Sequence, residues 1–404
     1  MEKEEQKKQA IERPEKESKS SIAGTTAPII EADGEKAERL PTVPLDSLKA
    51  IGELEPPVVS VHSVESTRTF SVPTPLVVQP AEYHRSTGEW MRIFWDGIRP
   101  SYLSLSLFPF LFGTVLAWSQ QVSSAHVLGH FRLLSFVLSL VALLLVHMGA
   151  NLINDYYDYI RGVDTSNPLG PGGLIQQGLI KPTRVLVLGL IFLGASALSG
   201  LATVLISMNW MLALFGLVGL LFAYFYSGSG KSLAALCLGP LVALGIFGPL
   251  VTIGAYIVQG GGDLHKALLY SLPLGLTAAA TILVNDMRDL EGDVQARKFT
   301  LANRLGLTWS RAIFLVLLLA AYGFAAFLAV PSHTPHWLLL AFLTLPLLVN
   351  IVTGILRASS PNSLHLVFRD MLRQNAWFGV LLLIGLIAST LVSAISLVPT
   401  HLMR

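Results

Sequence analysis

The chain has 404 residues, of which 52% are hydrophobic and 13% are charged, and its mean hydropathy is +0.59. Soluble domains have about 25% charged residues, so the composition excludes a water-soluble enzyme and a nucleic-acid-binding module. The net charge of +2 indicates no polyanionic partner, and the single cysteine excludes a disulfide framework.

The charged residues are concentrated near the N-terminus, where 30 of the 54 lie in residues 1–100. Residues 1–88 are rich in Glu, Lys, Ser and Pro and show no helical or strand period. A segment of this composition cannot bury enough apolar surface to offset the entropy lost on ordering. We therefore predict a disordered polar tail over residues 1–88 and a membrane domain over residues 89–404.

The membrane domain consists of apolar stretches of about 20 residues, the length that crosses a hydrocarbon core of about 30 Å. The predicted spans are 100–120, 131–153, 183–207, 209–227, 233–258, 264–285, 311–330, 335–356 and 375–398. The predicted fold is all-α, a polytopic bundle of nine transmembrane helices around a central cavity.

Lys and Arg are distributed unequally between the two sides of this topology. Fifteen lie in the end of the tail and in the loops after even-numbered spans, and three lie on the opposite side. Cytoplasmic loops are enriched in Lys and Arg. The sequence therefore predicts a multi-pass protein of the cell membrane with a cytoplasmic N-terminus and an external C-terminus.

Two predicted cytoplasmic connections are rich in Asn and Asp. The second span runs into NLINDYYDYIRGVD and the sixth into VNDMRDLEGD, so Asn-Asp-x-x-Asp occurs twice, 131 residues apart. On continuous helices each connection presents its carboxylates on one face, at i, i+4, i+7 or i, i+3, i+7 spacing. The first cluster comprises Asn151, Asn154, Asp155 and Asp158, and the second cluster comprises Asn285, Asp286, Asp289 and Asp293.

These clusters need an explanation because a carboxylate at the centre of a membrane helix costs about 2.5–3.5 kcal/mol. The five aspartates also repel one another unless cations lie between them. Helix capping requires one Asp at a terminus, which leaves two matched clusters unexplained. Mg²⁺ prefers carboxylates, retained waters and substrate phosphates. We therefore predict a metal-bridged diphosphate site where the two clusters meet, at the cytoplasmic mouth of the bundle.

The paired motifs resemble those of the UbiA-type intramembrane prenyltransferases, which bind a polyprenyl diphosphate through two Asp-rich motifs and Mg²⁺. NDYYDYIRGVDTSNPLGPGGLIQQGLI and NDMRDLEGDVQARKFTLANRLG are most similar to the menaquinone branch, the 1,4-dihydroxy-2-naphthoate polyprenyltransferases. WDGIRP, before the first span, also matches the family. The resemblance covers residues 90–400, and it fails at Pro240, where the family usually has an acidic residue.

The resemblance implies an enzyme that transfers a polyprenyl group from polyprenyl diphosphate to 1,4-dihydroxy-2-naphthoate, with decarboxylation, in menaquinone biosynthesis. The cofactor is Mg²⁺, and the partners are the two substrates and the lipid bilayer. The expected catalytic and metal-binding residues are Asp155, Asp158, Asp286, Asp289 and Asp293. The expected substrate-binding residues are Asn151, Asn154, Asn285, Lys181, Arg288, Arg297 and Lys298.

Two alternatives remain open at this point. The enzyme could use a different aromatic or lipid acceptor, or the clusters could bind the coupling cation of a transporter at broken helices. Transporter sites lie near the bilayer midplane, whereas these clusters lie at span ends beside Arg and Lys, which suits a phosphate better. His147, one turn before Asn151, extends the polar face into the membrane and is either functional or only a hydrogen-bond partner. Oligomeric state and prenyl chain length are not predicted.

Overall fold

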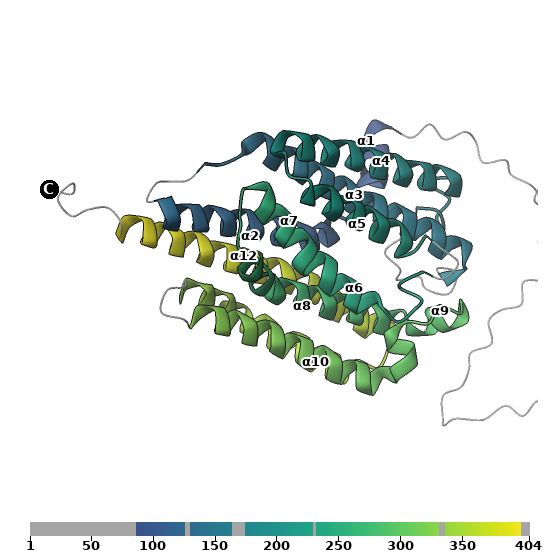
Figure 1. The fold of residues 1–404 in the computed structure, drawn as a ribbon. Helices are drawn as coiled ribbons and strands as arrows, with labels where there is room; N and C mark the ends of the chain where they lie inside the picture. Colours follow the sequence, from purple (N-terminus) through teal and green to yellow (C-terminus); the bar gives the residue numbers. More distant parts are fainter. Residues whose placement is uncertain (1–85, 126–129, 164–173, 229–231, 331–335, 397–404) are drawn as a thin grey trace, which may run out of the picture. The chain divides into compact units, whose positions relative to one another are not determined.

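The computed structural model describes residues 86–125, 130–163, 174–228, 232–330 and 336–396. The sequence predicts disorder for residues 1–88. Residues 1–85 of this segment lie outside the described residues. In the described part, the regular elements are helices that pack into one bundle (Figure 1). This confirms the predicted all-α class.

The first helix, α1 (Thr87–Ile98), begins inside the segment 1–88 that the sequence predicts to be the tail. Ser86 caps it through a capping box with Glu89, in which each side chain bonds the other residue's backbone N–H. The helix ends at Arg99, whose φ of 53° is left-handed, and Pro100 then begins α2. A residue before proline avoids the right-handed helical region, so the chain turns sharply between α1 and α2.

Eight helical segments of the described residues are long and apolar enough to cross a membrane. They are α2 (Pro100–Ala125), α3 (Leu133–Ile160), α4 (Pro182–Ser207), α6 to α7 (Gly239–Gly245 and Val251–Val258, joined by the π-helical turn Ile246–Leu250), α8 (Leu264–Arg288), α10 (Leu301–Ala329), η4 with α11 (His336–Thr344 and Leu345–Arg357), and α12 (Pro361–Ser396). The fourth predicted span forms α5 (Met211–Phe225), which has only 15 residues. Each of the nine predicted spans thus corresponds to a helical segment.

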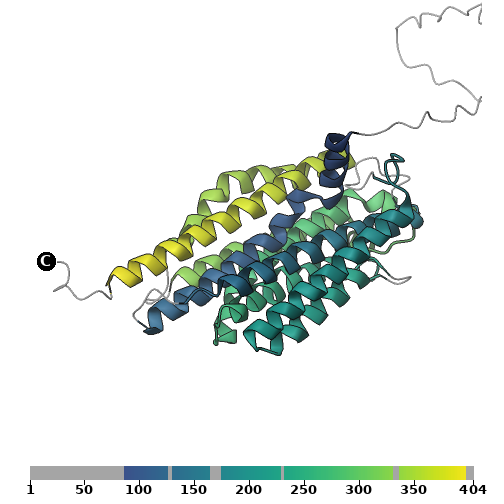
Figure 2. The ribbon, with the colours of Figure 1, turned by 90° about the horizontal axis from the view of Figure 1, so that it is seen from above.

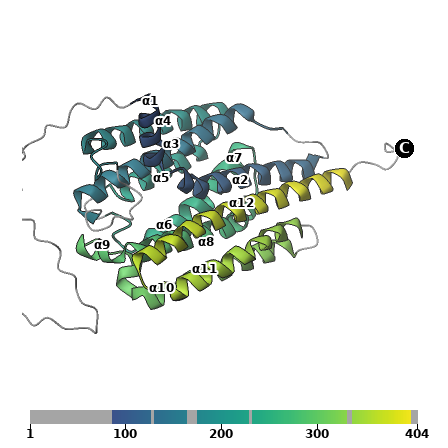
Figure 3. The ribbon, with the colours of Figure 1, turned by 180° about the vertical axis from the view of Figure 1, so that it is seen from behind.

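The helix axes are roughly aligned with one another, and the helices form layers (Figures 1 and 3). In Figures 1 and 3, α3, α4 and α5 lie on one side, α10 and α11 lie on the opposite side, and α2, α6, α7 and α8 lie between them. Figure 2 shows α12 beside α2, and the two helices pack together. Among the candidate spans α8 is the most buried, so the helix that leads to the second cluster is the centre of the bundle.

The outer helices expose large apolar side chains, including Leu198 on α4 and Leu319 on α10, which are 71% and 73% exposed. Such surfaces are unfavourable in water and suit contact with lipid tails. The chain is therefore a multi-pass membrane protein.

Glycine allows a close approach between α2 and α7. A Cβ atom at Gly113 would overlap the carbonyl oxygen of Thr252, whereas a Cβ at Gly194 on the exposed face of α4 would meet no atom within 4 Å. A backbone atom cannot move aside as a flexible side chain can. The α2–α7 contact therefore requires glycine at residue 113.

We predict that Gly113→Ala lowers the free energy of unfolding by about 1–3 kcal/mol, the usual cost of overpacking, and that Gly194→Ala does not lower it. Thermal unfolding of the two purified variants in the same detergent measures the difference. Equal melting temperatures for wild type and Gly113→Ala would show that the helices separate at no cost.

Candidate active site

A cavity of about 480 Å³ lies among α2, α3, α4, α5, α6, α7 and α8. Its lining is apolar along most of the helices and becomes polar toward the C-terminal ends of α3 and α8. The polar lining residues at this end are Arg99, Asn151, Asn154, Asp158, Asn285, Asp286, Asp289 and Lys298. The fold thus brings both clusters to one end of an apolar cavity, here called the polar end.

The first cluster lies on α3, which continues without a break to Ile160, as its spacing predicts. Asp155 is buried and forms an ion pair with Arg99, a hydrogen-bonded contact between a guanidinium nitrogen and a carboxylate oxygen. Asn151 donates a hydrogen bond of 3.1 Å to the carbonyl oxygen of Ile98, and Asn154 donates one to the Asp158 carboxylate. These contacts attach the α1–α2 junction to the first cluster.

The second cluster is divided between two helices. Helix α8 ends at Arg288, Asp289 lies at the junction, and α9 (Leu290–Gln295) follows. The expected single continuous helix is therefore wrong at Asp289, where the backbone leaves helical geometry. The amide of Asp293 still donates a 2.8 Å hydrogen bond to the carbonyl oxygen of Asp289, so the carboxylates remain one turn apart. Asp293 is fully enclosed and does not line the cavity.

Lys298 connects the two clusters. Its Nζ atom lies 3.4 Å from Asp293 Oδ1 and 3.7 Å from Asp158 Oδ1. Burial favours the neutral amine, but Asp158 and Asp293 outweigh this effect and raise the pKa of Lys298 above its usual value. Burial raises the pKa of Asp293 to about 7, with Lys298 opposing the shift and Asp289 and Asp158 adding to it.

Arg288 is directed away from the cavity. Its Nε and a terminal nitrogen donate hydrogen bonds of 2.7 and 2.6 Å to Asp289, and the terminal nitrogen also donates to Asn285 at 3.0 Å. The guanidinium lies over the Phe368 ring, 4.8 Å from its centroid. Arg288 therefore contacts Asp289 and Asn285 and does not line the cavity, and its predicted substrate-binding role stays a prediction.

Two other predicted substrate-binding cations lie apart from the clusters. Lys181 precedes α4 and Arg297 precedes Lys298, both are exposed, and neither lines the cavity. Arg99, by contrast, is not among the predicted site residues, and the structure places it at the polar end. Its position directly before Pro100, at a predicted membrane boundary, is the signal in the sequence that could have found it.

The carboxylates leave buried oxygen atoms without a hydrogen bond, which suit a hard cation. Asp155 Oδ2, Asp158 Oδ1, Asp286 Oδ2 and Asp293 Oδ1 are buried and accept no hydrogen bond within the described residues. Five carboxylates are accompanied by three cations, the buried Arg99 and Arg288 and the partly buried Lys298. In the described part of the chain, no three acidic, His or Cys side chains converge as a ready metal cage. The donors fit Mg²⁺ ions that retain water and phosphate ligands.

Comparisons with known proteins agree with this geometry. The model of the UbiA prenyltransferase family matches residues 106–379. The chain is 31% identical to a 1,4-dihydroxy-2-naphthoate octaprenyltransferase from Bacillus subtilis, over 77% of this chain and 96% of that protein. It is 35% identical to UbiA prenyltransferase domain-containing protein 1 of Danio rerio, over 62% of this chain and 71% of that protein.

The fold is also known from solved structures. A UbiA homologue from Archaeoglobus fulgidus, bound to GPP and Mg²⁺, superimposes with a TM-score of 0.51 at 17% identity, over 72% of this chain and 99% of that one. The region matched by the family model contains both clusters and most of the cavity lining. These findings confirm the resemblance seen in the sequence, and the chain belongs to the UbiA prenyltransferase family.

Proposed function

We propose that this enzyme transfers a polyprenyl group from polyprenyl diphosphate to 1,4-dihydroxy-2-naphthoate in an Mg²⁺-dependent, decarboxylating reaction of menaquinone biosynthesis. The observation that supports this most directly is the meeting of two Asp-rich clusters at one end of an apolar cavity. The Bacillus subtilis relative is a 1,4-dihydroxy-2-naphthoate octaprenyltransferase, which supports the acceptor. The Archaeoglobus fulgidus homologue binds GPP and Mg²⁺, which supports the diphosphate and the metal.

The residues at the polar end would bind the leaving group. Asp155, Asp158, Asp286, Asp289 and Asp293 would hold Mg²⁺, which when bound neutralises charge on the diphosphate. Asn151, Asn154 and Asn285 offer neutral amide groups to the same end of the site. Because Arg99 and Lys298 line the cavity as well, they place positive charge beside a departing diphosphate.

The apolar part of the cavity would control the fate of the prenyl group. The bond between the prenyl carbon and the diphosphate oxygen breaks, and the diphosphate leaves with the electron pair. The walls exclude bulk water, so the allylic cation is captured by the aromatic ring at the carbon that bears the carboxylate. Carbon dioxide then leaves, and its bonding electrons restore the aromatic ring.

The acceptor is the least constrained part of this proposal, and another aromatic or lipid acceptor is the alternative. Pro240 stands where the family usually has an acid, and the neighbouring Gly239 lies against the site. A Cβ at Gly239 would be 3.4 Å from the Tyr226 hydroxyl and 3.5 Å from Asp286 Oδ2. Family membership and the position of both clusters near helix ends favour the prenyltransferase over a cation-coupled transporter.

We also propose that the N-terminus and the polar end of the cavity face the cytoplasm and that the C-terminus lies outside. The fifteen-to-three distribution of Lys and Arg supports this orientation.

Prenyl transfer is expected to need both Mg²⁺ and Asp286. Membranes that contain the protein would receive labelled geranylgeranyl diphosphate and 1,4-dihydroxy-2-naphthoate, with Mg²⁺ or EDTA. We expect EDTA to abolish the lipid-soluble product and Asp286→Asn to reduce its rate by about 100-fold or more. The exposed Asp370, paired with Arg373 at 3.9 Å, provides the control Asp370→Asn, which should retain full activity.

Product formation that survives both EDTA and Asp286→Asn would contradict the proposed site. Product with a different aromatic or lipid compound, and none with the naphthoate, would retain the prenyltransferase and reject this acceptor.

The raised pKa of Asp293 predicts that stability without metal falls as the pH rises. The folded protein keeps until about pH 7 a proton that the unfolded chain releases near pH 3.8. The free energy of unfolding therefore falls as the pH rises from 3.8 to about 7, and it falls no further above about pH 7. From about pH 5.5 to about pH 7 the free energy of unfolding should fall by roughly 2 kcal/mol. We expect Mg²⁺ to offset this loss because it favours the ionised carboxylate.

Thermal unfolding in detergent, with EDTA or Mg²⁺ at each pH, measures this effect. Asp293→Asn should make the pH dependence in EDTA shallower, and Asp370→Asn should leave it intact. Identical pH profiles for wild type and Asp293→Asn would refute the assignment to Asp293.

The proposed orientation predicts which end of α8 is accessible from the cytoplasm. Glu291 and His265 are exposed near opposite ends of this helix. In a Cys237→Ser background, Glu291→Cys should react with a membrane-impermeant maleimide only in inverted vesicles. His265→Cys should react only in right-side-out vesicles, and the reverse pattern would invert the topology.

A further inference from the structure

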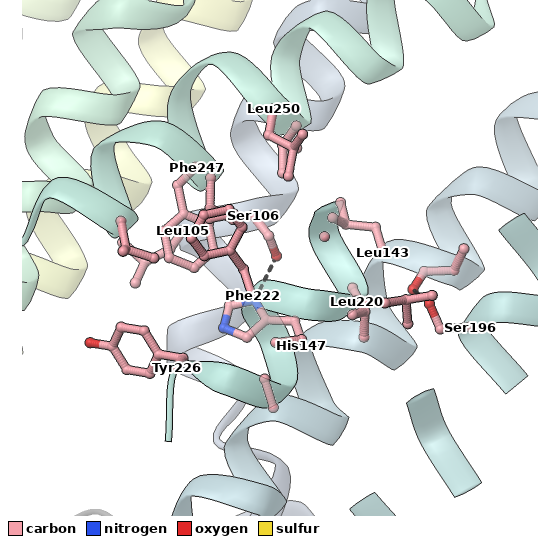
Figure 4. Close-up of a pocket in the computed structure, with 18 of the residues that line it drawn as sticks. Leu105, Ser106, Leu143, His147, Ser196, Leu220, Phe222, Tyr226, Phe247 and Leu250 are labelled. Carbon is pink, nitrogen blue, oxygen red and sulfur yellow. Dashed lines mark hydrogen bonds between the residues drawn. The ribbon is translucent and has the colours of Figure 1, made fainter. Parts of the chain in front are cut away.

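A hydrogen-bonded pair of polar side chains lies in the cavity wall, away from the two clusters. His147 on α3 and Ser106 on α2 both line the cavity, and Ser106 Oγ is 2.7 Å from His147 Nδ1. Figure 4 shows this bond among apolar and aromatic side chains. His147 precedes Asn151 by four residues, which places it about 6 Å deeper along the helix axis. The chemistry described above gives this pair no role.

The contacts of Ser106 favour one of the two neutral tautomers of His147. The serine hydroxyl has one proton, and Oγ lies 3.1 Å from the carbonyl oxygen of Leu103, a group that can only accept. Both contacts are satisfied when Ser106 donates to Leu103 and His147 Nδ1–H donates to Ser106. In that tautomer Nε2 has a free lone pair and is a hydrogen-bond acceptor.

The Nε2 atom of His147 opens onto the cavity. It has no hydrogen-bond partner among the described residues, and His147 as a residue is 9% exposed and lines the cavity. In Figure 4 the ring nitrogen that is not bonded to Ser106 points into the cavity, near the labelled aromatic residues Phe222, Tyr226 and Phe247. The Phe247 ring lies 5.3 Å from the imidazole, at an interplanar angle of 35°.

We propose that His147 Nε2 accepts a hydrogen bond from a ring hydroxyl of the aromatic acceptor, and that Ser106 is the positioning residue that fixes the required tautomer. This inference rests on the proposed function and specifies its substrate class as a hydroxylated arene. A hydroxyl group is a donor and matches a lone acceptor nitrogen. The aromatic side chains nearby offer faces on which a flat ring can stack.

The position of His147 also suits the geometry of transfer. A ring held about one helical turn beyond Asn151 lies between the polar end, where the diphosphate departs, and the apolar part that accommodates the prenyl chain. A single directional hydrogen bond together with stacking fixes which ring carbon faces the cation. His147 would therefore determine the acceptor and the site of its alkylation, while the clusters determine the donor.

The test compares a phenol with its methyl ether in matched variants. Purified wild type, His147→Phe and Ser106→Ala would be assayed with geranylgeranyl diphosphate and either 1,4-dihydroxy-2-naphthoate or its two monomethyl ethers. Ser139→Ala is the control, because Ser139 also lines the cavity but bonds only the carbonyl oxygens of Ser135 and Phe136 in its own helix. The readouts are kcat/KM for each acceptor and KM for the diphosphate.

We expect wild type and Ser139→Ala to prefer the free phenol over one of the ethers by about tenfold, the value of a hydrogen bond. In His147→Phe this preference should disappear, and in Ser106→Ala it should be reduced. The KM for geranylgeranyl diphosphate should change by less than about twofold in every variant, because removing one hydrogen-bonded pair leaves the diphosphate contacts in place. If His147→Phe does not fold, Ser106→Ala against Ser139→Ala provides the same comparison.

Two results would contradict the role of His147 and Ser106 without contradicting the proposed prenyl transfer. One is an ether discrimination that persists in His147→Phe, and the other is an equal increase of KM for both substrates, as a structural role would produce. If wild type prenylates no hydroxylated arene, the proposed function fails first, and this inference fails with it.

Discussion

The gathering of five largely buried carboxylates at one end of an apolar bundle is the constraint on which the rest of this structure depends. A buried charge must be paired, protonated or bound to a cation, since leaving it uncompensated costs several kcal/mol. Arg99 pairs with Asp155, Arg288 with Asp289, and Lys298 lies between Asp158 and Asp293. Two of these three cations come from outside the helices that bear the carboxylates. Compensation therefore draws the α1–α2 junction and the α9–α10 connection onto the ends of α3 and α8.

This requirement explains local features that would otherwise look accidental. Arg99 adopts a left-handed backbone conformation, which is unfavourable for a residue with a side chain. The ion pair to Asp155 and the bond from Asn151 to the Ile98 carbonyl hold the chain in this turn. The break at Asp289 has a related origin, because its carboxylate is turned back onto Arg288. At Arg99 and at Asp289 the departure from helical backbone coincides with a charge pair.

The periodic part of this arrangement could be predicted from the sequence, and the choice of partners could not. Apolar length located the spans, and Asn-Asp-x-x-Asp at two span ends predicted that the clusters meet. Which cation faces the cavity depends on tertiary packing. Arg288 lies within the second motif, yet it is held over Phe368, whereas Lys298 reaches both clusters from the following loop. The role of Ser106 could not be predicted for a similar reason. A single serine in an apolar span has no recognisable function until the fold shows that it contacts His147.

The division between charged and neutral polar groups along the cavity follows from the same electrostatics. Charge is concentrated where α3 and α8 end, where the proposed diphosphate would bind, so the desolvation cost stays limited. A charged residue at the depth of His147 would need its own counter-ion in a wall built from Leu, Val and Phe side chains. A hydrogen-bonded serine and histidine avoid that cost and still provide a directional acceptor atom. In the proposed reaction, neutral recognition at this depth would also place no fixed charge beside the allylic cation.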